Sequence, residues 1–274
     1  MESSKNRKIT LIAVAAIVII MAGYFYWDLK GSPSVESPVV SQDSNASTTS
    51  FTQGGVTVQL PAGSTIEQVG PEQGKVPQSI PDLKRPLRFS GVFANDMQAQ
   101  SIMTKKILDL EASLGKDPAS LDNWILLGVD RKILGDYEGA RDAWNYAGLL
   151  SPTNVVSFNN LGDLYENELR NYSLSEQSYF RAIKNDPAYV PSYENLSNLY
   201  RYYYKKDTSS AADILKQGLS VSPDNVDLMA AIARYYAATG DKKDAATYYQ
   251  QAIARAKSLG NAQLEASLRA ESAQ

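Results

Sequence analysis

Carboxylates are the residues in this sequence whose type and spacing come closest to suiting acid–base chemistry. The 274-residue chain has no histidine and no cysteine. That composition excludes imidazole and thiolate metal sites, cysteine nucleophiles and the Ser-His-Asp triad. Asp241 and Asp244 stand where a helix is predicted to begin, which favours a capping role. We therefore expect no catalytic residues, no metal site and no cofactor.

One alternative from a different class is a hydrolase that uses a carboxylate pair such as Glu67 and Glu72. Residues 51–93, which contain this pair, are rich in proline and too short to form an independent core. Nucleic acid is also a poor candidate for a partner. The chain has 27 Lys and Arg against 30 Asp and Glu, and a net charge of −3 gives no attractive field for a polyanion.

Residues 9–27 form an uncharged, strongly apolar segment. As a helix, 19 residues extend about 28 Å, close to the thickness of the hydrocarbon core of a bilayer. Lys5, Arg7 and Lys8 precede the segment, and Tyr24 to Trp27 form an aromatic cluster at its far end. We expect a single-pass transmembrane anchor, with the basic tail 1–8 in the cytoplasm and everything after Trp27 on the other side. A cleaved signal peptide is the alternative, since Ala13 and Ala15 would permit cleavage after Ala15, although too few apolar residues precede that site.

Residues 28–93 are predicted to be a flexible stalk and extended linker. From Gly31 to Ser50 the chain has few apolar residues and no aromatic ring, so it cannot offset the entropy of ordering. Residues 56–60 alternate between apolar and polar types, which predicts one possible short strand. Four prolines keep residues 71–90 extended, and apolar side chains such as Leu83 and Leu87 suit contact with a neighbouring surface.

Beyond this linker a pattern repeats about every 34 residues. Four prolines, Pro118, Pro152, Pro187 and Pro223, are 34, 35 and 36 residues apart. After each of them a large residue is followed by Leu or Ile, a small residue and usually Tyr, at spacings that share one face of a helix. The sets are Trp124, Leu127, Gly128 and Arg131; Phe158, Leu161, Gly162 and Tyr165; Tyr193, Leu196, Ser197 and Tyr200; and Met229, Ile232, Ala233 and Tyr236.

The second half of each unit repeats in the same way. Its members are Ala140, Trp144 and Ala147; Ser175, Tyr179 and Ala182; Ala211, Leu215 and Gly218; and Ala245, Tyr249 and Ala252. Each unit is thus a pair of antiparallel helices that cannot bury its own apolar faces without a neighbour. The pattern resembles the tetratricopeptide repeat. Arg131 departs from it where Tyr is usual, and the fourth unit has no final proline.

The expected fold is all-α, a right-handed α-solenoid over residues 94–274 with a helical cap at each end. We expect a cap helix over 94–114, repeats at 121–154, 155–189, 190–225 and 226–259, and a C-terminal cap at 261–272. Terminal helices of this kind cover the apolar faces that the end units would otherwise expose.

The resemblance implies a concave groove, lined by the first helix of each unit, that binds a peptide or a partner protein. The lysines and asparagines that grip a terminal carboxylate in some members of the family are not evident here. Tyr202 is expected on the groove, whereas Tyr203 and Tyr204 should pack at the junction with the next hairpin. Ile125, Val129, Lys132, Ala230 and Ala237 also share the groove face, and the partner-binding candidates are Asn159, Asp163, Glu166, Glu194, Asn198, Arg201, Tyr202 and Arg234.

Together these features predict a membrane-anchored scaffold or chaperone-like adaptor that docks a partner protein in the cell envelope. The alternative is an adaptor whose repeats face the cytoplasm and recruit signalling or secretion components.

Overall fold

The computed structural model describes residues 39–41, 50–53, 56–59, 79–206 and 210–273. The predicted basic tail 1–8, the predicted transmembrane helix 9–27 and most of the predicted stalk lie outside these residues. Within the described ranges, no helix has both the length and the apolar character needed to cross a bilayer.

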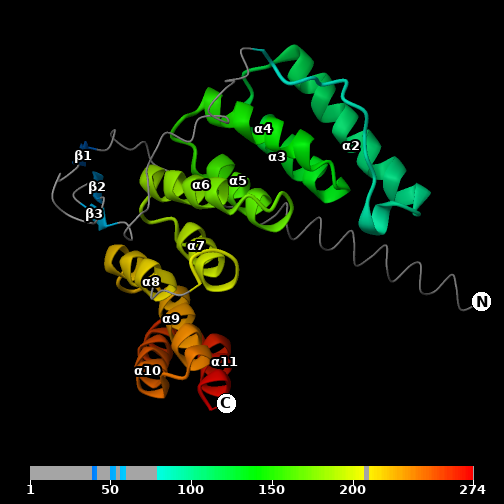
Figure 1. Cartoon of the computed structure of the whole chain (residues 1–274). Helices are drawn as coiled ribbons and strands as arrows, with labels where there is room; N and C mark the ends of the chain where they lie inside the picture. The colour runs from blue at the N-terminus through cyan, green and yellow to red at the C-terminus, as the bar shows by residue number, and fades with distance from the viewer. Residues whose placement is uncertain (1–38, 42–49, 54–55, 60–78, 207–209, 274) are drawn as a thin grey trace, which may run out of the picture.

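Helices account for nearly all of the described structure after residue 90. Four hairpins follow one another in the chain and stack along an arc from α2 to α11 (Figure 1). This helix-turn-helix architecture confirms the predicted all-α class for this part of the chain. The hairpins are α3 (Leu121–Leu134) with α4 (Tyr137–Leu150), α5 (Val155–Asn167) with α6 (Tyr172–Asn185), α7 (Val190–Tyr202) with α8 (Ser210–Val221), and α9 (Val226–Thr239) with α10 (Lys242–Ser258).

Side chains at the turns define where several of these helices begin. The carboxylate of Asp136 accepts a hydrogen bond from the amide of Gly139, and Asp241 does the same for Asp244. Asn154, Asn171 and Asn225 cap α5, α6 and α9 in the same way. Each cap satisfies a backbone N–H that has no partner within its helix.

The repeated large and small residues meet where the helices of a hairpin cross. Trp144 is buried against Gly128, and its indole Nε1 donates to the carbonyl of Ile125 at 3.0 Å. A Cβ atom on Gly128 would lie 2.3 Å from that Nε1, and one on Gly162 would lie 2.5 Å from the ring of Tyr179. Glycine at these two positions therefore sets how closely the paired helices approach.

A terminal helix covers each end of the stack. At the N-terminal end, α2 (Met97–Lys116) buries Met103, Ile107 and Leu114 against the first hairpin. At the C-terminal end, α11 (Ala262–Ser272) buries Leu268 against the last. A short 3₁₀ helix, η1 (Gly91–Phe93), precedes α2.

The segment 80–90, which we call the strap, lies across the first hairpin. Leu83, Leu87 and Phe89 pack on its core, and the amide of Ser90 donates to the carbonyl of Leu134 at 2.9 Å. The sequence predicts this segment to be part of an extended linker whose leucines suit contact with a neighbouring surface, and the strap makes such a contact. Its apolar side chains and its hydrogen bond to α3 offset the entropy of ordering the segment.

Three short strands form a small antiparallel sheet ahead of the strap. The strands are β1 (Val39–Ser41), β2 (Ser50–Gln53) and β3 (Val56–Gln59), in the order β1-β2-β3, with Phe51 opposite Val58. Contacts between β3 and α8 place this sheet beside the third hairpin (Figure 1). The sequence predicted one strand at 56–60. Its two partners were missed because β1 and β2 are short and lie in a segment rich in Ser and Thr.

Candidate functional site

The inner face of the stack is built from the first helix of each hairpin. Helices α3, α5, α7 and α9 contact one another in that order, so their exposed edges form one continuous surface. All eight predicted binding residues lie on α5, α7 or α9. They differ in whether their side chains are buried in the packing of the repeats, held in ion pairs, or exposed.

Two of the eight residues are buried and serve the packing of the repeats. Asn159 is 8% exposed, and its Oδ1 accepts hydrogen bonds from Ser192 Oγ at 3.1 Å and Asn195 Nδ2 at 3.2 Å, which ties α5 to α7. Glu166 is 5% exposed and accepts a 2.9 Å hydrogen bond from the hydroxyl of Tyr179. Among the other residues predicted on this face, Ile125 and Ala230 are also buried. The helical spacing alone did not separate these inward side chains from the exposed ones.

Burial gives Glu166 an unusual affinity for protons. The pKa of its carboxyl is raised to about 7, mainly by desolvation and also by the charge of Asp163, while the hydrogen bond from Tyr179 and the charge of Lys132 lower it. The same burial, together with the negative charge of Glu166, raises the pKa of the Tyr179 phenol. This pair therefore places a carboxyl group that titrates near neutrality beside the inner face.

Asp163 and Arg234 are held by ion pairs that run along the inner face. Asp163 pairs with Lys132 of the preceding unit and accepts a 2.8 Å hydrogen bond from Asn167 Nδ2. Arg234 contacts Glu271 of α11 through two hydrogen bonds of 2.7 and 3.1 Å. These pairs link successive helices and leave the charges of both residues largely compensated.

The third unit carries the most open part of the inner face. Asn198 is exposed, and Glu194 is half-buried. Burial raises the pKa of Glu194, as does the charge of Asp227, whereas Arg234 lowers it. Arg201 lies over the ring of Tyr202 with its guanidinium carbon 4.8 Å from the ring centre, and Tyr202 is 48% exposed. These side chains, from α7, are the ones best placed to meet a ligand.

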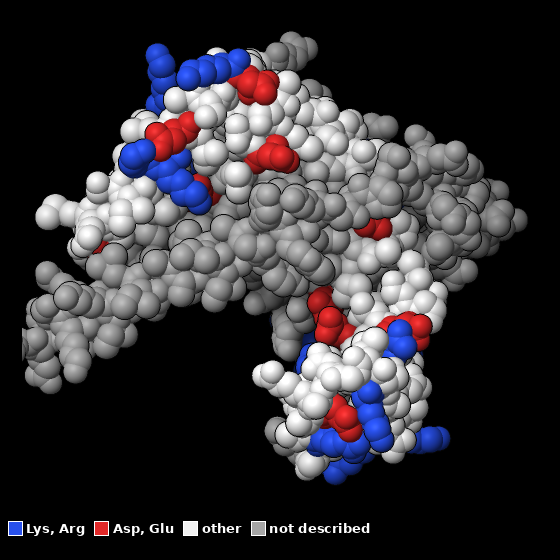
Figure 2. All heavy atoms as spheres, turned by 180° about the vertical axis from the view of Figure 1, so that it is seen from behind, with Lys and Arg blue, Asp and Glu red and all other residues white. Residues whose placement is uncertain are grey.

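Charges of both signs are interspersed over the described surface. Figure 2 shows Lys and Arg beside Asp and Glu on the face seen there, in agreement with the small net charge. Within the described ranges there is no group of three or more side chains suited to holding a metal ion.

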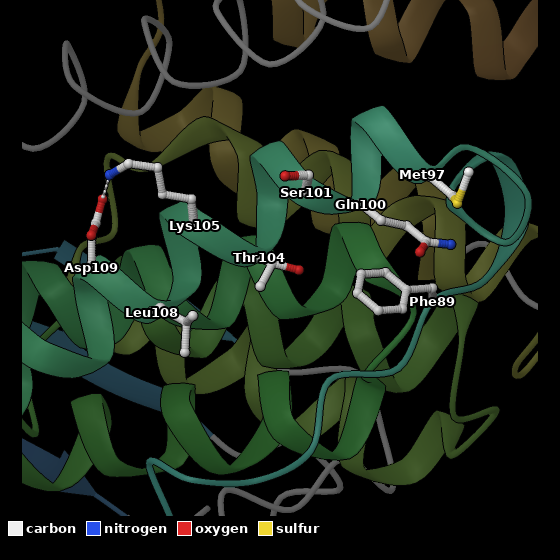
Figure 3. A pocket seen from close by; sticks show the side chains of 8 residues that line it. All are labelled: Phe89, Met97, Gln100, Ser101, Thr104, Lys105, Leu108 and Asp109. Atoms are coloured by element: carbon white, nitrogen blue, oxygen red, sulfur yellow. Dashed lines mark hydrogen bonds and ion pairs between the residues drawn. The ribbon is translucent and has the colours of Figure 1, made fainter.

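A separate groove of about 630 Å³ follows the outer side of α2, at the N-terminal end of the stack. Figure 3 shows Phe89, Met97 and Leu108 along it, with the Lys105–Asp109 ion pair at one end. Met97 is 83% exposed and Leu108 is 53% exposed. The groove lies at the end of the stack, and none of the eight predicted binding residues lines it.

Comparison with known proteins identifies part of the stack. Residues 228–263, which include most of α9 and all of α10, match the model of the tetratricopeptide repeat. The chain carries a tetratricopeptide repeat. No curated protein matches the sequence.

Several solved structures are similar in fold to the chain. The crystal structure of MamA is 18% identical and covers 60% of this chain and 94% of its own, with a TM-score of 0.48. That of pilF from Pseudomonas aeruginosa is 19% identical and covers 62% of this chain and 83% of its own, with a TM-score of 0.46. YrrB, described as a TPR protein with an unusual peptide-binding site, is 16% identical. It covers 65% of this chain and 88% of its own, with a TM-score of 0.43.

One departure from the tetratricopeptide signature proves to be a buried ion cluster. Arg131 replaces the usual Tyr, is 2% exposed, and pairs with Asp136 and with Glu111 of α2, the latter at 2.6 Å. Arg85 of the strap also contacts Asp136, at 3.2 Å. A lone arginine within an apolar stripe of the sequence was the signal for this cluster. Its carboxylate partners come from separate elements, so the sequence did not reveal them.

Tyr235 is a second residue that the sequence analysis missed. Its ring centre lies 5.9 Å from the guanidinium carbon of Arg201, so α9 contributes an aromatic side chain beside Tyr202. Tyr203, expected in a junction, is instead 38% exposed and stacks on Tyr172 of the preceding hairpin. The run of tyrosines at 202–204 and the pair at 235–236 were the available signals.

Proposed function

We propose that this chain is a protein-binding scaffold whose inner face receives an extended peptide or a helix of a partner protein. The observation that carries the proposal is the open part of the inner face on α7. There Asn198 and Tyr202 are exposed, although the neighbouring core residues of the same helix are fully buried. Amide and guanidinium groups suit the backbone of an extended chain, and tyrosine supplies contact area at low entropic cost.

Site-specific photo-crosslinking in cells tests this function. A photoreactive phenylalanine analogue at Asn198 is expected to capture a discrete partner, identified by mass spectrometry. The same analogue at Lys257, an exposed residue of α10, is the matched control and should not capture that partner. Equal labelling from both positions, or no adduct from Asn198, would contradict the proposal.

The second part of the proposal concerns location. Residues 9–27 anchor the chain in a membrane and the repeats lie on the extracytoplasmic side, so that the partner is another protein of the cell envelope. The support comes from the sequence: the segment is uncharged and long enough to span, and basic residues precede it. A cytoplasm-facing adaptor uses the same inner face on the opposite side of the membrane.

Fractionation followed by protease treatment of spheroplasts separates these arrangements. Recovery in the membrane fraction and digestion of the repeats in intact spheroplasts support the extracytoplasmic arrangement. Full protection of the repeats favours the cytoplasmic adaptor. Recovery in the soluble fraction would contradict anchoring by residues 9–27, whichever way the repeats face.

A further inference from the structure

A chain of ring contacts crosses the third and fourth hairpins and reaches the second. We call it the tyrosine ribbon. Tyr172 stacks on Tyr203 with their ring centres 5.6 Å apart, and Tyr203 meets Tyr202 edge-on with their ring centres 6.3 Å apart. Arg201 then bridges the rings of Tyr202 and Tyr235. The ribbon continues from Tyr235 to Tyr236 at 5.6 Å and from Tyr236 to Tyr248 at 6.0 Å.

The core of the stack holds the ribbon in place. Tyr172, Tyr235, Tyr236 and Tyr248 are partly buried and pack against the apolar cluster between α6 and α9. Tyr202 and Tyr203 are the most open, at 48% and 38% exposed. Rings that are already fixed lose little conformational freedom when a ligand settles on them, so the ribbon is preorganised for contact.

Positive charge accompanies these rings. Arg170, Arg201 and Lys216 lie on or beside the ribbon, and Lys216 is 5.2 Å from the centre of the Tyr236 ring. The carboxylates of Glu168 and Asp213 act on Arg170 and Lys216, whereas the guanidinium of Arg201 lies between two tyrosine rings. Elsewhere on the inner face, by contrast, Lys132 and Arg234 are each paired with a carboxylate. The ribbon is therefore a cationic aromatic surface within a chain of net negative charge.

We propose that the tyrosine ribbon binds an extended, acidic peptide segment that contains proline. Arg201 is fixed between the rings of Tyr202 and Tyr235, where its guanidinium can meet an acidic side chain of the peptide. Aromatic surfaces are also what extended proline-containing segments use, because their preformed conformation costs little entropy on binding. This proposal rests on the proposed scaffold function and names the chemistry of the partner segment at Arg201 and Tyr202.

Fluorescence anisotropy on the full chain in detergent tests the proposal with labelled twelve-residue peptides. The probes are alternating Glu-Pro, Gln-Pro, Lys-Pro and Glu-Gly. The Glu-Pro peptide should bind at least about tenfold more tightly than each of the others, and its affinity should fall as salt rises. Y202A and R201Q should each weaken binding by about tenfold or more. K257Q on α10 removes an exposed cation away from the ribbon and should leave binding unchanged.

Other outcomes would overturn the assignment. Equal affinity for all four peptides, or no loss in Y202A and R201Q with unchanged circular dichroism, would remove the ribbon as the binding surface. Tighter Tyr202-dependent binding to phosphatidylglycerol vesicles or to an oligo-dT strand would assign the ribbon to a membrane or a nucleic acid. If crosslinks from Asn198 persist while the Glu-Pro peptide fails to bind, the scaffold function stands and only the ribbon proposal falls.

Discussion

At the scale of single residues, Glu166 links the packing of the second hairpin to pH. Its pKa of about 7 in the folded chain lies above the ordinary value of 4.5, so the folded state holds this proton more tightly than the unfolded state does. Its contribution to the free energy of unfolding is therefore fully present below about pH 4.5 and is lost as pH rises to about 7. A neutral amide at this position escapes that loss.

As the pH rises from 5 to 8, the natural chain should lose stability that Glu166→Gln keeps. The free energy of unfolding of the variant should therefore rise by about 1 to 3 kcal/mol relative to that of the natural chain over this range. Urea unfolding at several pH values measures this difference, and the exposed Asp122, changed to Asn, is the control. Parallel pH profiles for the natural chain and the Gln variant would show that Glu166 titrates as an ordinary carboxyl.

Gly162 is a second residue at which the structure predicts the size of a mutational effect. A Cβ atom there would lie 2.5 Å from the Tyr179 ring, and that ring is buried and bonded to Glu166, so it cannot easily retreat. We expect Gly162→Ala to lower the free energy of unfolding by about 1 to 3 kcal/mol.

Gly115→Ala is the matched control for that change. Gly115 lies in α2 with no atom within 4 Å of an added Cβ, so alanine should stabilise the chain by about 0.5 to 1 kcal/mol. Chemical unfolding compares the two variants. A loss of similar size in both would mean that the helix crossing tolerates a methyl group.

At the scale of elements, the strap is held by a short run of charges as well as by apolar contacts. Arg85 reaches Asp136 at 3.2 Å and Asp142 at 3.1 Å, which fastens the strap to α4. We expect Arg85→Ala to release the strap locally and to speed chymotrypsin cleavage at Phe89 by about tenfold, while the helical signal is kept. Mass spectrometry of the first fragments follows this cleavage.

Arg88→Ala is the control for the strap, because Arg88 is 67% exposed and its ion pair with the partly exposed Glu138 is long, at 3.6 Å. Its cleavage rate should match that of the natural chain. Equal rates for Arg85→Ala and the natural chain would show that the apolar contacts hold the strap by themselves. Fragments for binding studies should start before residue 79, since a start at residue 91 removes the strap.

At the scale of the whole molecule, the sequence predicted what depends on local periodicity. The spacing of Trp124, Leu127 and Gly128, repeated along the chain, was enough for the helical hairpins because each hairpin contacts mainly its neighbours. Features that join distant segments were missed, such as Arg131 with Glu111 or Tyr203 with Tyr172. For the same reason the burial of Asn159 and Glu166 did not follow from their helical positions, because it depends on side chains of the next helix.

The turns within the hairpins differ in backbone conformation, and this difference affects the stability of the chain. In the first and fourth hairpins a glycine takes the left-handed conformation, at Gly135 (φ 87°) and Gly240 (φ 89°). In the second and third hairpins, Arg170 (φ 55°) and Lys205 (φ 56°) take it instead, although such a conformation is unfavourable for a residue with a side chain. Arg170 lies beside Tyr172, and Lys205 lies over the rings of Tyr200 and Tyr204 with its ammonium 2.7 Å from Glu176. The central hairpins thus accept a less relaxed backbone in order to keep these contacts, so a search for heat-resistant variants alone would favour replacing these two residues and losing the contacts.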